Sequence, residues 1–307
     1  MSEIIELANY LFALATNIII LAHVQLVNSK DFNWYEKLYR LDRLLADKYR
    51  VKINHASIGR RSLWKILITF TFACVCSTVN FCYAKKSSNY VPYLYAHNYF
   101  LKTIINLRYI QNFTRFDFIT HRIEAVHKAV RDIVEQNTVE WKIVLVLDTF
   151  KRQHRGSLKK IDDVDDVVML KEFYSTLFES MKTLEQIFGW SLLAMFSFAF
   201  IDLTSNMYWF FIAYLNLDEH IQIIDSIFEI IPSVSIIICA IYSSFNASRK
   251  GRELIISVSK LYTNTTSCYN RVVKEFLMQI YHERLEISAN DFFIVDFQLC
   301  TAVSNYW

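Results

Sequence analysis

Long stretches without a charged side chain restrict this sequence more than any other feature. Residues 7–29, 66–84 and 230–248 contain no Asp, Glu, Lys or Arg. Each is close to the ~20 residues that an α-helix needs to cross the roughly 30 Å hydrocarbon core of a bilayer. None shows the period-two alternation of a membrane β-strand. The stretches therefore predict an all-α, multi-span transmembrane helical bundle.

Two further stretches each contain a single acid. Residues 186–217 are interrupted only by Asp202, and residues 292–307 only by Asp296. The first is long enough to cross a bilayer and extend beyond it, whereas the second ends before it reaches the length of a span. We expect the last span to be incomplete.

Residues 87–113 are a weaker candidate because Lys102 and Arg108 interrupt them. Both bases lie toward one end of the stretch, where long basic side chains can extend to the lipid headgroups. With this stretch there are six candidate spans. No linker rich in Pro, Gly or Ser divides the 307 residues, which contain only 4 Gly and 2 Pro, so we predict a single membrane domain over 1–307.

The composition excludes several classes of protein. Hydrophobic residues make up 53% of the chain and charged residues 21%, with a mean hydropathy of +0.20. Those values are unlike a soluble enzyme and make membrane lipid an expected partner. The net charge of +3 is dispersed, which argues against nucleic acid as a partner. No catalytic, cofactor-binding or metal-binding motif is present, and Cys74-x-Cys76 lacks the spacing of a zinc site.

The connections between spans predict an orientation. Residues 30–61 hold nine bases against four acids, and residues 249–284 are also basic. The connection that follows residue 217 carries acids and no base. Since Lys and Arg concentrate on the cytoplasmic side, the N-terminus is predicted outside and both basic connections inside.

Apolar residues recur at helical spacing beyond the candidate spans, so membrane helices are expected to continue into the cytoplasm. One stripe runs from Ile123 to Leu145, and another from Leu170 to Phe188. Apolar stripes on helices outside the bilayer need a partner. They either pack together within the chain or join subunits.

Asp202 is the first candidate ligand-binding residue, because a carboxylate within a span is costly and usually faces a cavity, a pathway or a partner. The alternative is that Asp202 lies near enough to the outer surface to be solvated, or is neutral. Aromatic residues at the predicted outer ends of spans either form an interfacial belt or line a pocket for a small organic molecule. The candidates for such a pocket are Tyr95, Tyr99, Tyr208 and Trp209.

Near its end the sequence reads Phe-Leu-Met-Gln at 276–279, then His282, Ile-Ser-Ala-Asn-Asp-Phe-Phe at 287–293 and Val-Asp-Phe at 295–297. This order resembles the C-terminal region of insect gustatory receptors, which belong to the seven-transmembrane insect chemoreceptor superfamily. In that family a cytoplasmic helix with a Gln and a His precedes a Phe-rich entry to the last membrane helix. Asn305 stands where that helix carries Thr before Tyr, so we expect a member of the family that is truncated within its last helix.

The resemblance implies a chemoreceptor in the plasma membrane of taste neurons. Such receptors assemble as homo- or hetero-tetramers and act as ligand-gated cation channels, with small tastants bound in the outer half of each subunit. The last helix lines the pore, and Asp296, Gln298 and Asn305 are carried over as positions on it. Because the family has seven spans and a cytoplasmic N-terminus, six spans that begin outside fit a chain without the first helix.

Two other functions remain open at this level. A multi-span transporter typically shows repeated halves or helices broken by Gly or Pro, and this chain is poor in both residues. A non-conducting signalling or scaffold membrane protein would have the same spans without a pore. Blocking the current without loss of surface expression would separate a channel from this last class.

Overall fold

The computed structural model describes residues 2–51, 53–87, 92–150, 162–215, 220–262 and 267–296. These residues form six α-helices: α1 (Ser2–Tyr49), α2 (His55–Ser87), α3 (Pro92–Phe150), α4 (Asp162–Leu215), α5 (His220–Ser259) and α6 (Ser267–His282). The only β contact among them is an isolated antiparallel bridge between Ser288 and Ile294. The predicted all-α class is confirmed.

Within the described ranges, three helices contain segments long and apolar enough to cross a membrane. These segments are Leu7–Val27 in α1, Val164–Leu215 in α4 and Ser226–Ser259 in α5. They overlap the predicted spans 7–29, 186–217 and 230–248, and the second begins well before its predicted span.

The other predicted spans have different positions. Span 66–84 falls within α2, and span 87–113 falls mainly on α3, which begins at Pro92. Most of 292–307 lies outside the described residues, and the part inside is irregular.

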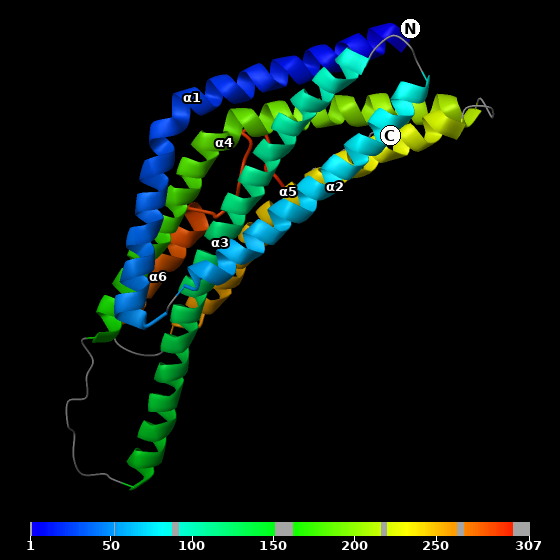
Figure 1. Ribbon diagram of the computed structural model, residues 1–307. Helices are drawn as coiled ribbons and strands as arrows, with labels where there is room; N and C mark the ends of the chain where they lie inside the picture. Colours follow the sequence, from blue (N-terminus) through cyan, green and yellow to red (C-terminus); the bar gives the residue numbers. More distant parts are fainter. Residues whose placement is uncertain are drawn as a thin grey trace.

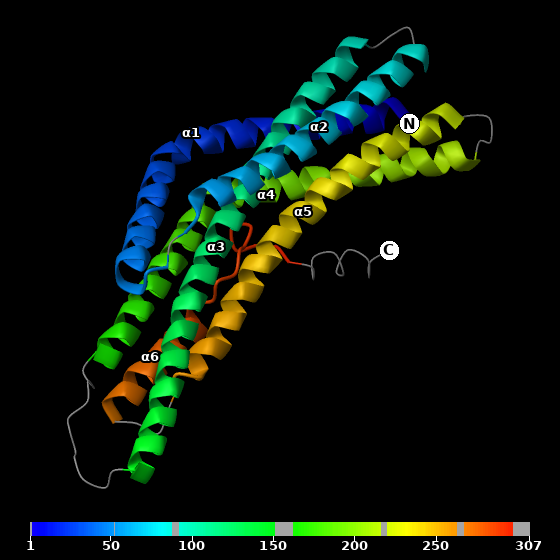
Figure 2. The same cartoon turned by 60° about the horizontal axis from the view of Figure 1, so that its bottom comes forward.

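The helices are long and run side by side in a bundle whose upper ends spread apart (Figures 1 and 2). In both views α1 and α4 bend, and α1 packs along α4 while α3 packs along α5. The short helix α6 lies against the lower parts of α4 and α5. Helices α1, α3 and α4 continue well past the predicted spans, which is the extension expected from their apolar stripes.

The lower part of the bundle has a dense apolar core. On α1, Trp34, Leu38, Leu41 and Leu45 recur every three or four residues and are at most 2% exposed. The described members of both apolar stripes predicted beyond the spans are also buried or partly buried. Burial of each such side chain contributes about 1.5–3 kcal/mol relative to exposure in water. Of the two alternatives for these stripes, packing within the chain is confirmed.

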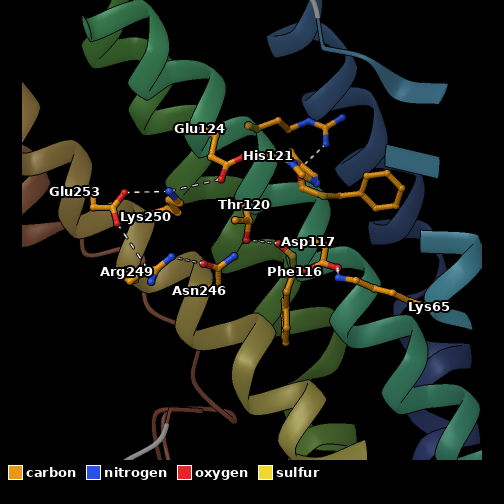
Figure 3. Close-up of polar contacts among 12 residues, drawn as sticks. Lys65, Phe116, Asp117, Thr120, His121, Glu124, Asn246, Arg249, Lys250 and Glu253 are labelled. Atoms are coloured by element: carbon orange, nitrogen blue, oxygen red, sulfur yellow. Dashed lines mark hydrogen bonds and ion pairs between the residues drawn. The ribbon is translucent and has the colours of Figure 1, made fainter. Parts of the chain in front are cut away.

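Ion pairs connect α3 to its neighbours at the edge of this core (Figure 3). The Lys250 ammonium on α5 lies 3.1 Å from Glu253 and 3.7 Å from Glu124 of α3. Lys65 of α2 is paired with Asp117 of α3. Most of these side chains are partly exposed, so each pair contributes about 1 kcal/mol or less. Their main effect is to fix which parts of α2, α3 and α5 lie opposite one another.

The segment after α6 is irregular but firmly held against α4. Glu185 of α4 accepts hydrogen bonds from the backbone NH of Ser288 at 2.8 Å and from its hydroxyl at 2.9 Å. Gly189, one turn along α4, allows close approach: a Cβ there would lie 3.2 Å from the Cβ and the amide nitrogen of Asn290. Asn290 and Asp291 adopt positive φ angles of 54° and 61° at the turn.

This anchored segment, residues 283–296, contains the Ile-Ser-Ala-Asn-Asp-Phe-Phe sequence that carries the family resemblance. Its apolar members Ile287 and Ala289 are buried. This sequence pattern therefore corresponds to a loop that packs against α4.

Candidate ligand-recognition site

Three charged side chains from three helices meet inside the bundle. The Lys102 ammonium of α3 lies 2.9 Å from an Asp202 carboxylate oxygen of α4 and 3.0 Å from a Glu229 carboxylate oxygen of α5. These three residues are called the ionic cluster below. One ammonium faces two carboxylates, so the cluster carries a formal charge of −1.

Two neutral side chains complete the contacts of Asp202. The Asn9 amide on α1 donates to one carboxylate oxygen at 3.1 Å. The Ser233 hydroxyl on α5, one turn beyond Glu229, donates to the other at 3.1 Å. Side chains from α1, α3, α4 and α5 therefore converge on a single group.

The ionic cluster is shielded from solvent. The side chain of Asp202 is 2% exposed, that of Lys102 15% and that of Glu229 18%. Taking charges out of water is costly, and their mutual attraction offsets the cost only when the geometry is good. Charges within membrane segments usually mark a ligand or ion pathway for this reason. The burial of Asp202 argues against the solvated alternative, whereas the alternative of a neutral Asp202 stays a hypothesis.

Two buried polar groups with unmet hydrogen-bonding capacity lie on the same helix faces as members of the ionic cluster. Tyr109, which is 3% exposed, follows Lys102 by seven residues and so shares its face of α3. Asn206 follows Asp202 by one turn of α4. In the described part of the chain, neither the Tyr109 hydroxyl nor the Asn206 side-chain nitrogen has a hydrogen-bond partner. Such groups can bind polar atoms of a ligand, or water.

The predicted aromatic residues differ in their relation to this cluster. Tyr99 precedes Lys102 by three residues and Tyr95 by seven, which places both on the same face of α3. Trp209 follows Asp202 by seven residues and shares its face of α4. Tyr208 lies off that face, is 37% exposed and contacts the Trp209 ring edge-on, with centroids 5.5 Å apart. The side chain of Tyr95 lies outside what the structure describes.

The predicted positions on the last helix cannot be placed in the same way. Asp296 lies at the end of the described residues, in irregular chain, and its backbone NH donates to Ile294 O at 3.1 Å. Gln298 and Asn305 lie outside the described residues.

The structure corrects the interpretation of the two bases in span 87–113. Neither extends toward headgroups. Lys102 is paired inside the bundle, and Arg108 lies over the Phe188 ring at 4.1 Å and donates to Ile187 O at 3.1 Å. The cost of an unpaired charge in an apolar interior favours an internal partner where one is within reach.

Sequence reasoning identified Asp202 but missed Lys102, Glu229, Asn9 and Ser233 as its partners. A signal was available, because a lone base and a lone acid in different apolar segments each require a partner. Which helices would bring them together was not readable from spacing along the chain.

Comparison with known proteins gives the relatives of this chain. The family model described as 7tm chemosensory receptor matches residues 1–304. Insect olfactory receptor OR5 from Machilis hrabei, solved in complex with eugenol, is similar in structure with a TM-score of 0.56 at 11% identity, over 96% of this chain and 79% of that one. A second structure of the same receptor gives 0.54 at 8% identity, over 99% and 85%. No curated protein matches this chain.

Proposed function

Because this chain belongs to the family of 7tm chemosensory receptors, we propose that it is a gustatory-type receptor of the plasma membrane of sensory neurons, a subunit of a cation channel that opens when a small tastant binds. The family consists of receptors and not of enzymes. Insect olfactory receptors share its fold, and the C-terminal sequence from 276 to 297 favours the gustatory branch among them.

The observation that carries the ligand-binding part of the proposal is the ionic cluster. A charged, hydrogen-bonded group that joins four helices stabilises one arrangement of them. A ligand that exchanges hydrogen bonds with Asp202, Tyr109 or Asn206 changes the relative stability of two arrangements, which is the requirement for gating by a ligand. Aromatic side chains on the same helix faces, Tyr99 and Trp209, supply apolar contact area.

The proposed assembly is a homo- or hetero-tetramer with other receptor subunits. In this arrangement the last helix, with Asp296, Gln298 and Asn305, lines a shared pore. The fit of residues 283–296 against α4 supports a link between the ligand site and the pore, because it connects the segment leading to that helix with the helix that carries Asp202.

The first test is calcium influx in cells that display the chain at their surface, with and without known co-expressed subunits, against a panel of small tastants. We expect at least one class to evoke a response. Asp202→Asn should require about tenfold more tastant, because it removes a buried charge-assisted hydrogen bond. Glu172→Gln, an exposed acid on the same helix, is the matched control and should respond like the wild type.

The other outcomes separate the alternatives. An Asp202→Asn protein with an unchanged response contradicts the role of the ionic cluster. Tastant uptake without current indicates a transporter, and surface expression with neither uptake nor current indicates a non-conducting membrane protein.

A further inference from the structure

A pocket lies far along α1 from the ionic cluster, beyond the predicted spans. It is a cavity of about 280 Å³ between α1, the start of α2 and the middle of α3. The side chains that line it are Trp34, Tyr35, Leu38, Tyr39, Asp42, His55, Phe118 and Arg122. The volume is at the small end for a ligand pocket and suits a molecule with one aromatic ring.

The walls are aromatic and their positions are fixed. Trp34 is fully buried, and its indole NH donates to Ser180 O of α4 at 3.0 Å. The ring of Tyr35 meets that of Trp34 edge-on with centroids 4.8 Å apart. Tyr35 and Tyr39 are 49% and 60% exposed, so they form the rim, while Trp34 and Leu38 form the base. A preformed aromatic cavity binds a flat apolar ring at low cost in ordering.

The cavity also contains a buried ion pair with unmet capacity. Arg122 donates to Asp42 Oδ2 at 2.6 Å, and the two side chains are only 7% and 6% exposed. His55 approaches the same oxygen to 3.6 Å. Among the described residues, Asp42 Oδ1 and Arg122 Nε have no hydrogen-bond partner. A buried acceptor and a buried donor therefore remain available beside an aromatic wall.

The charges around the cavity argue against a cationic guest. Arg43 lies 5.3 Å from the centre of the Tyr39 ring, and Arg115 lies 5.6 Å from that of Tyr35. A guanidinium group therefore already occupies one face of each of these rings, and Arg122 already neutralises Asp42. A neutral molecule is not repelled by these positive charges.

We propose that this cavity is a second small-molecule site, which takes a neutral aromatic molecule bearing a hydroxyl group, as in a phenol. The ring packs against Trp34, Tyr35 and Phe118. A small rotation of the Asp42 side chain brings Oδ1 to the hydroxyl, which donates to it. Because the site joins α1, α2 and α3 outside the predicted spans, its occupation stabilises their packing independently of the ionic cluster.

Photo-cross-linking of the full chain in lipid nanodiscs tests the proposal, with 4-azidophenol as the probe. We expect mass spectrometry to find the label on the peptide that contains Tyr35 and Tyr39. 4-Methylphenol should compete about tenfold better than toluene, which has the same ring without the hydroxyl, because one hydrogen bond is worth about that factor.

Three variants test where the probe binds and whether Asp42 contacts it. His55→Trp places a large ring at the rim, where His55 is 58% exposed, and should abolish the labelling. Phe32→Ala lies on α1, the helix that carries Tyr35, is 74% exposed and is outside the cavity, so it should leave the labelling unchanged. Asp42→Asn, checked for an unaltered elution profile, should make 4-methylphenol and toluene compete more equally.

The proposal is overturned if His55→Trp labels like the wild type, if the label is found only elsewhere in the chain, or if 4-methylphenol and toluene compete equally in the wild type. None of these measurements needs channel activity, so their failure would leave the proposed receptor function untouched.

Discussion

The charge balance at Lys102 makes this residue sensitive to substitution. Lys102→Met leaves Asp202 and Glu229 facing each other without a counter-charge, which should destabilise the fold by about 3–5 kcal/mol. Adding Asp202→Asn and Glu229→Gln removes the charges and should restore most of the loss. Lys37→Met, which breaks an exposed pair with Glu179, should cost about 1 kcal/mol or less. Thermal unfolding in nanodiscs measures all three, and a lone Lys102→Met protein as stable as the wild type would contradict the pairing.

His127 is a residue at which acid should weaken the fold. Burial, with Arg131 adding to it, lowers the pKa of His127 below its ordinary value of 6.5, and the ring is hydrogen-bonded to the Ser257 hydroxyl at 2.6 Å. The unfolded chain therefore binds this proton more readily than the folded one, so stability falls as pH drops through about 6.5. Lys250 opposes protonation, whereas Glu124 and Glu253 favour it. The fall in melting temperature between pH 7.5 and 5.5 should be smaller in His127→Gln, and an identical fall would refute this assignment.

At the scale of elements, the fit between α4 and residues 283–296 depends on Gly189. Gly189→Ala brings a methyl group to 3.2 Å from Asn290, and we expect a loss of about 1–3 kcal/mol and faster proteolysis within 283–296. Gly59→Ala is a matched control, because nothing lies within 4 Å of the added carbon on α2. There the helix should be unchanged or more stable by up to about 1 kcal/mol. Equal protease sensitivity of the two variants would show that Gly189 does not control the fit.

For the whole molecule, apolar length and helical spacing were sufficient to predict helices and their buried stripes, because both depend on local geometry and on burial. The ionic cluster was not predicted in full. Lys102 lies 100 residues from Asp202 and 127 from Glu229 along the chain, and only the packing of the three helices decides which turns face each other. The C-terminal pattern is recognisable in the sequence, but its physical basis is not. The contacts of Ser288 with Glu185 arise from tertiary structure.

The orientation of the whole bundle is the remaining consequence of the charge pattern. Residues 249–284 are predicted to be cytoplasmic, and Cys268 at the start of α6 is exposed. A maleimide that cannot cross membranes should therefore label Cys268 only after the cells are permeabilised, with Cys268→Ser as the variant that identifies the signal. Asp218→Cys, in the predicted outer connection, should be labelled in intact cells. The opposite pattern would invert the bundle, and with it the cavity beside Asp42 would face outward and the ends of α4 and α5 inward. A tastant arriving from outside would then meet the Asp42 cavity first, so this labelling decides which of the two sites can receive an external ligand.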